Sequence, residues 1–181
     1  MKRPSMPQTG RNSMAEIMTV LVTVAMWIVG AMGVVGIPVL AIGLTASLSG
    51  GATEISGIKA LAEGVMPGQL VIGLVGLMVI VPGVIFICLQ LRRILLTLAD
   101  GDPFVPENAS RLSHIGIAIA AMELLRVMTV LVVSAVPTLV GDEPPRLSTQ
   151  FILWISVAAL FVLSQVFREG TRLRDEEKMT I

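Results

Sequence analysis

Long apolar stretches, separated by shorter polar segments, occupy most of this chain. Three of them carry no charged residue, at 17–48, 69–91 and 150–167, and a fourth at 115–136 is interrupted only by Glu123 and Arg126. Because about 20 helical residues cross the hydrocarbon core of a bilayer, each stretch is long enough to be a span. With the adjoining amphipathic residues included, the pattern predicts an all-α, transmembrane four-helix bundle with spans at about 17–48, 69–98, 107–136 and 150–168.

Composition supports a membrane protein and argues against several other classes. Hydrophobic residues make up 54% of the chain, charged residues 14%, and the mean hydropathy is +0.86. A soluble domain of this length has too little interior for so much apolar surface. The formal net charge is zero, so no basic excess favours direct binding of nucleic acid. One cysteine and one histidine are too few ligands for an ordinary zinc site, and we expect no metal and no cofactor.

The positions of lysine and arginine predict the orientation, because cytoplasmic segments retain positive charge during insertion. Only Lys59 and Arg146 fall on one side of the predicted spans. The other side would hold Lys2, Arg3, Arg11, Arg92, Arg93, Arg111, Arg168, Arg172, Arg174 and Lys178. We therefore expect both termini to be cytoplasmic, with an N-terminal segment at 1–16, a transmembrane domain at 17–168 and a C-terminal tail at 169–181. An outer loop after the first span is expected to hold a short amphipathic helix.

Small residues suggest where the spans pack, since small side chains let helices approach closely in lipid. The first span offers Gly30, Gly33 and Gly36, and the second offers Gly73 and Gly76. In the third span Gly116, Ala120 and Glu123 fall at i, i+4 and i+7, which is one helical face. Glu123 should therefore face other helices and not lipid.

Glu123 and Arg126 are the candidate intramembrane site. Their i, i+3 spacing lets them neutralise each other, which lowers the cost of about 2.5–3.5 kcal/mol that an isolated charge pays at mid-membrane depth. One interpretation is a structural ion pair, and the alternative is a polar site for a ligand, proton or ion. Thr23 in the first span and Ser156 in the fourth lie at similar predicted depth, and we expect them to hydrogen-bond to the pair.

The link between the second and third spans has the residues of a fixed turn. Gly101 suits a left-handed helix cap, and Pro103 prevents the second helix from continuing. Pro106 and Glu107 suit the first turn of the next helix. The Glu107 carboxylate is expected to pair with Arg92, Arg93 or Arg168.

Two segments carry a family resemblance: GDPFVPENASRL at 101–112 and FREGTRLRDEEKMTI at 167–181. Together with the spacing of the four spans, they resemble a bacterial four-helix membrane family catalogued as domain of unknown function 2975, over essentially the whole chain. The resemblance implies a multi-pass inner-membrane protein without an assigned activity. It also implies a connection, through gene neighbourhood, with a small helix-turn-helix transcription regulator. Ser113 and His114 stand where a further basic residue would be expected.

No feature of the chain indicates an enzyme, because a nucleophile with its base, a metal cluster and a phosphate loop are all missing from the sequence. We expect a regulatory or scaffolding membrane protein that presents a cytoplasmic surface to a soluble partner such as the helix-turn-helix protein. That surface would comprise Asp102, Pro103, Phe104, Glu107, Asn108, Arg168, Glu169 and Arg172. The alternative is a small transporter or channel that uses Glu123 and Arg126; with only four helices, it would need a homo-oligomer to form a path.

Overall fold

In the computed structural model the described chain forms four long helices, which confirms the all-α fold class. The structure describes residues 11–48, 65–102, 104–136, 139 and 150–179. The helices are α1 (Arg11–Leu48), α3 (Pro67–Ala99), α4 (Pro106–Ser134) and α6 (Phe151–Met179). Each is long and apolar enough to cross a membrane, so the chain is a multi-pass membrane protein. The outer loop expected to hold a short helix lies outside the described residues.

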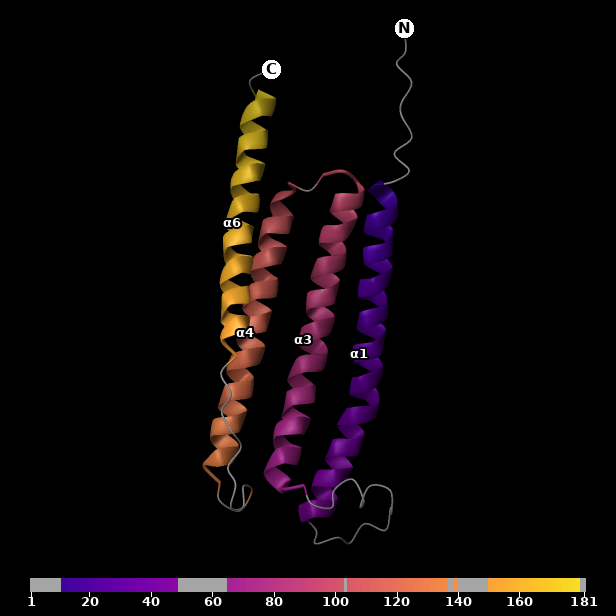
Figure 1. Ribbon diagram of the computed structural model, residues 1–181, viewed down its shortest axis with the longest axis vertical. Coiled ribbons are helices and arrows are strands. Elements are labelled where there is room, and N and C mark those ends of the chain that lie inside the picture. Colours follow the sequence, from indigo (N-terminus) through magenta and orange to yellow (C-terminus); the bar gives the residue numbers. More distant parts are fainter. Residues whose placement is uncertain (1–10, 49–64, 103, 137–138, 140–149, 180–181) are drawn as a thin grey trace.

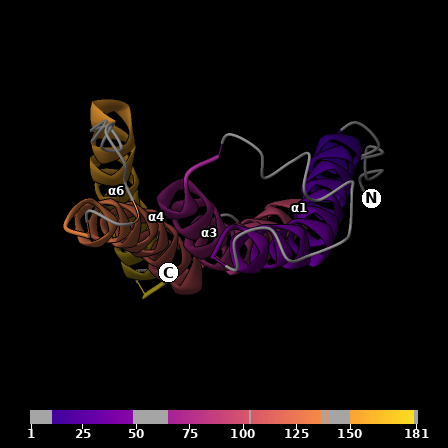
Figure 2. The ribbon, with the colours of Figure 1, turned by 90° about the horizontal axis from the view of Figure 1, so that it is seen from below.

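The helices pack in an open row that follows the order of the chain. α1 packs on α3, α3 on α4, and α4 on α6, whereas α1 contacts neither α4 nor α6 within the described residues. Seen along the helices, the four elements follow one line from α6 to α1 (Figure 2). Large apolar side chains are consequently exposed along the row, such as Trp27 at 73% and Val34 at 76%. In lipid this exposure is expected, because the acyl chains are as apolar as the side chains.

The connection between α3 and α4 is set by local backbone chemistry. α3 ends at Ala99 with Asp100 as its C-cap, and Gly101 then takes a positive φ of 80°, a conformation that glycine adopts without steric strain. α4 begins with Pro106 in its first turn and Glu107 beside it, as expected from the sequence. Pro103 lies outside the described residues. The α3–α4 turn lies at the same end of the molecule as the start of α1 and the C-terminal part of α6, and α6 extends beyond the turn (Figure 1). We call this end the turn end.

Only some of the small residues predicted to lie between helices do so. A Cβ atom added to Gly33 or Gly36 would come within 2.8 Å of Val81 or Leu77 of α3. One added to Gly116 would lie 3.5 Å from Phe161 of α6. Nothing lies within 4 Å of a Cβ added to Gly30 or Gly76. Among these glycines, Gly33, Gly36 and Gly116 lie at helix contacts as predicted, whereas Gly30 and Gly76 do not.

A buried apolar cluster lies toward the turn end, where side chains of α3 and α6 meet those of α4. Its buried centre is Ile94 of α3 with Leu112 and Ile115 of α4. Leu160 and Phe167 of α6 pack against this centre. The cluster fixes the three helices relative to one another next to the α3–α4 turn, and so it supports the polar contacts described below.

Candidate functional site

Glu123 and Arg126 form a bidentate ion pair within α4. Arg126 Nε donates to Glu123 Oε2 over 2.8 Å, and Nη2 donates to Oε1 over 2.6 Å. Glu123 is buried, with 5% of its surface exposed, whereas the Arg126 side chain keeps 31%. The expectation that Glu123 turns away from lipid is confirmed. Since both partners belong to one helix, the i, i+3 spacing alone brings the opposite charges together.

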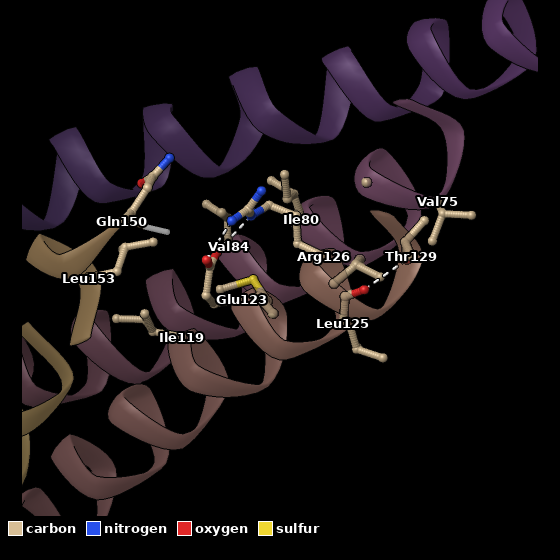
Figure 3. Close-up of a pocket in the computed structure, with 13 residues that line it drawn as sticks. Val75, Ile80, Val84, Ile119, Glu123, Leu125, Arg126, Thr129, Gln150 and Leu153 are labelled. Carbon is tan, nitrogen blue, oxygen red and sulfur yellow. Dashed lines mark hydrogen bonds and ion pairs between the residues drawn. The ribbon is translucent and has the colours of Figure 1, made fainter. Parts of the chain in front are cut away.

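Beside the pair lies a pocket of about 260 Å³ between α3 and α4, near the start of α6. Figure 3 shows Glu123 and Arg126 among apolar side chains of its wall. Its lining consists of Val75, Gly76, Val79, Ile80, Val84, Ile119, Met122, Glu123, Leu125, Arg126, Thr129, Gln150 and Leu153. An apolar pocket with few polar groups is typical of small-molecule sites. This geometry keeps the ligand-site interpretation open.

Thr23 and Ser156 do not join the intramembrane pair, which corrects the expectation from depth alone. Thr23 Oγ1 donates to the Thr19 carbonyl over 2.7 Å, and Ser156 Oγ donates to the Ile152 carbonyl over 2.8 Å. Each hydroxyl thus bonds to its own helix one turn earlier, which is the usual solution for serine and threonine in membrane helices. Thr23 belongs to α1, a helix that does not contact α4 in the described chain.

A second polar network lies at the turn end, between α3 and α4. Its centre is Asn108, which has no exposed surface. Asn108 Nδ2 donates to Thr97 Oγ1 over 2.7 Å, and its Oδ1 accepts from Arg111 Nη1 over 2.8 Å. Arg111 Nη1 also lies 3.4 Å from the Arg93 carbonyl oxygen, to which it donates. The prediction that Asn108 belongs to the exposed surface is wrong, because its side chain is buried between the two helices and joins them.

The same end is joined to α6 by contacts over long distances in sequence. Arg174 forms a two-pronged ion pair with Asp102, and its Nη2 lies 3.0 Å from Oδ2. Thr171 Oγ1 donates to the Phe104 carbonyl over 3.2 Å. The rings of Phe104 and Phe167 have centroids 5.7 Å apart. These contacts join the α3–α4 turn to α6 by an ion pair, a hydrogen bond and a ring contact.

Gly170 makes this contact possible. A Cβ added there would come within 2.8 Å of the Phe104 ring, closer than packed atoms approach. Phe104 itself remains 40% exposed. The two segments that carry the family resemblance are therefore packed against each other, with the α3–α4 turn seated on the end of α6.

The remaining predicted surface residues lie apart from this junction. Glu107 is exposed and forms no ion pair with any described residue, so its expected pairing with an arginine is not found. Arg168 is exposed as well. Arg172 pairs with Glu169 over 2.8 Å and with Glu176 over 3.5 Å along the exposed side of α6. Our interpretation of the C-terminal charges as a solvated helix face agrees with these exposures.

Sequence reasoning missed several buried polar groups. Ser164 of α6 is 1% exposed, and its hydroxyl donates to the Ala109 carbonyl and contacts the Ser113 hydroxyl, each over 2.8 Å. Gln90 of α3 is 8% exposed, and its side-chain oxygen has no hydrogen-bond partner in the described chain. The signal for Gln90 was present: Ile87, Gln90 and Ile94 are spaced as one helical face. Among the described residues, no cluster of three metal-ligating side chains occurs.

Comparison with known proteins identifies the family. A family model described as "Protein of unknown function (DUF2975)" matches residues 44–181, from the end of α1 through α6. The expected membership is confirmed, although most of the first helix lies outside the match and the similarity is narrower than the whole chain. No curated protein and no solved structure matches. The matched segment covers three of the four helices and both segments of the turn-end junction, and the chain belongs to the DUF2975 family.

Proposed function

We propose that the protein is a membrane scaffold that presents a fixed surface, built from the α3–α4 turn and the end of α6, to a soluble protein. The observation that supports it is the junction itself. Asp102, Phe104, Thr171 and Arg174 hold the turn and the helix in one arrangement. A surface whose parts are fixed before binding loses less conformational entropy when a partner docks.

The side of the membrane on which this surface lies is part of the proposal. Most basic residues of the chain belong to segments at the turn end, and only Lys59 and Arg146 belong to the opposite connections. The positive-inside rule therefore favours a cytoplasmic turn end, in a bacterial inner membrane. A cysteine at 172 that reacts with a membrane-impermeant thiol reagent in intact cells would contradict this orientation.

The exposed side of α6 is where we place the partner. Glu169, Arg172 and Glu176 alternate in charge there, and Leu173 between them is 51% exposed. An exposed apolar side chain surrounded by polar groups has the arrangement of a small interface, with an apolar centre and a polar rim. The resemblance to the family favours a small helix-turn-helix regulator as the partner, held at the membrane in this way.

Site-specific crosslinking tests the proposal. Cys88 is the single cysteine and is buried. After Cys88 is replaced by Ala, the variant Arg172→Cys can carry a photoreactive group at position 172 alone. The purified helix-turn-helix protein should crosslink at position 172. A matched cysteine at Phe151, which is 76% exposed at the opposite end of α6, should not crosslink. If both positions react equally, or neither reacts, the docking surface is refuted.

A transporter is the second candidate function, favoured by the pocket beside Glu123 and Arg126. Because the row of helices is open and α1 does not contact α6, an enclosed path would require a second copy of the chain. Glu123→Gln keeps the shape of the side chain and removes its charge. For this function, the substitution should abolish proton or solute flux in proteoliposomes, and unchanged flux would exclude the pair from transport.

A further inference from the structure

The arginines of the described chain fall into two groups. Arg126, Arg172 and Arg174 each pair with a carboxylate. Arg92, Arg93, Arg111 and Arg168 have no carboxylate partner among the described residues. Acidic residues are equally numerous in the chain, with 13 of each sign. No described carboxylate therefore neutralises the positive charge of the second group.

Two members of this group meet where α3 and α4 pack. Arg111 Nη1 donates to the Arg93 carbonyl over 3.4 Å and to Asn108 Oδ1 over 2.8 Å. Asn108 is completely buried and is itself held by Thr97. The position of the Arg111 guanidinium is therefore set by a buried amide before any ligand arrives.

The remaining donors of Arg111 suit a phosphate. Nη1 is occupied by two neutral oxygens, while no described residue accepts a hydrogen bond from Nε or Nη2. The Nε and Nη2 hydrogens are parallel, and they match two oxygens of a phosphate. Arg93 is exposed and belongs to the neighbouring helix, and its backbone lies next to Arg111, since its carbonyl oxygen is 3.4 Å from Arg111 Nη1. A long, flexible side chain that starts so close can bring a second guanidinium to the same phosphate.

Depth determines what kind of phosphate this would be. The uncharged part of α3 ends directly before Arg92, and the uncharged part of α4 resumes directly after Arg111. Arg93, which follows Arg92, and Arg111 thus lie where the hydrocarbon core gives way to the lipid headgroups. Phe86 and Leu89, exposed by 41% and 39%, share a face of α3 with Arg93 at i, i+3 and i+7 and extend into the apolar part. A ligand with a phosphate and an acyl chain fits both regions.

We propose that Arg93 and Arg111 bind the phosphate of an anionic phospholipid in the leaflet at the turn end. The site differs from the α6 surface of the scaffold function, and either one would stand if the other failed. Basic pockets between helices at this depth are known to recognise anionic headgroups. The acyl chain would lie along Phe86 and Leu89.

Native mass spectrometry of the purified full-length protein tests the site, with phosphatidylglycerol and phosphatidylcholine as probes. Wild-type protein should retain phosphatidylglycerol in preference to phosphatidylcholine. Arg93→Gln should reduce that preference roughly fivefold, and addition of Arg111→Gln by a similar factor, since each basic residue near a membrane surface contributes attraction of this size. Arg111→Lys should restore less than half of the loss, because an ammonium lacks the parallel donors.

Arg172→Gln is the matched control, since it removes an exposed arginine that is paired with carboxylates on another helix, α6. It should leave lipid retention unchanged. Arg93→Gln should also leave the unfolding temperature in detergent unchanged, because that side chain makes no hydrogen bond to any described residue. Equal retention of the two lipids, or equal losses in the Arg93 and Arg172 variants, would overturn the site. Displacement of the lipid by millimolar inorganic phosphate would overturn the assignment to a lipid.

Discussion

The two polar regions of this protein pair their charged side chains in opposite ways, one within a single helix and the other between distant segments. The intramembrane pair, Glu123 and Arg126, is complete within one turn of α4. The turn-end junction instead joins groups far apart in the chain, as when Asp102 meets Arg174, 72 residues later. One region is buried in an apolar surrounding and local, whereas the other is half-exposed and long-range. The local pair keeps a charge tolerable inside lipid, and the long-range junction determines how α6 sits on the turn.

This difference predicts unequal energetic weights. Inside an apolar environment, an unpaired charge finds no water, so loss of one partner costs more than the pair contributes. At the half-exposed junction water can replace a lost partner, and each ionic contact has a small effect. Packing and buried hydrogen bonds should then account for most of the junction's stability. Four sets of variants test this ranking.

The largest effect is expected for Glu123→Ala. It removes the carboxylate that accepts two hydrogen bonds from Arg126 within the apolar part of α4, and we expect a loss of about 3 kcal/mol in the free energy of unfolding. The double variant with Arg126→Ala removes both charges and should be more stable than the single variant. Thermal unfolding in detergent measures both. Equal unfolding temperatures of the single and double variants would show that the pair has no such role.

Asn108→Ala is expected to have the next largest effect. It removes buried hydrogen bonds to Thr97 and from Arg111, each with a net contribution of about 1 kcal/mol. The loss should therefore be about 2 kcal/mol. Glu107→Ala is the matched control, since it changes the preceding, exposed residue of the same turn and should cost less than about 0.5 kcal/mol. Similar losses in the two variants would contradict a buried role for Asn108.

Gly170→Val tests the seat of the turn on α6. The added side chain would overlap the Phe104 ring, and overpacking of this kind costs about 1–2 kcal/mol. Hydrogen exchange should rise at the end of α6, in residues 168–179, and stay unchanged near Glu123. Gly30→Val is the control, because it also replaces a helical glycine but meets no atom within 4 Å. Matching exchange profiles would indicate that Gly170 is not a packing contact.

The two regions differ in how well the sequence predicts them, because their partners lie at different separations along the chain. The ion pair could be read from the i, i+3 spacing of Glu123 and Arg126, since helix geometry converts that spacing into contact. The junction could not, because no periodicity relates Asp102 to Arg174 or Phe104 to Gly170. The sequence marked both segments only through the family resemblance. Thr23 and Ser156 show the limit of reasoning from depth: helices at equal depth need not touch, and a hydroxyl can be satisfied by its own helix.

Asn108 shows a second limit. Its position near a helix start, beside proline and glutamate, is typical of an exposed turn, yet the side chain is fully buried. Inside the protein, the Asn108 amide hydrogen-bonds to Thr97 of the preceding helix and to Arg111. The packing of α3 on α4 brings these three side chains together. The fold class followed from apolar length alone, because span length is a property of each segment. Which polar side chains meet is a property of pairs of segments.

The smallest effect is expected for the ion pair between Asp102 and Arg174. Both side chains are well exposed, by 43% and 36%, so Asp102→Asn should cost less than about 1 kcal/mol. A double-mutant cycle with Arg174→Gln should give a coupling energy of the same size, and that energy should fall at 1 M salt, where the screening length is about 3 Å. The same cycle on Glu123 and Arg126 should not respond to salt, since ions do not enter the apolar part of the helix row. If instead the Asp102 cycle exceeds the Glu123 cycle and resists salt, the junction is held by charge and not by packing, and the ranking of the two regions is reversed.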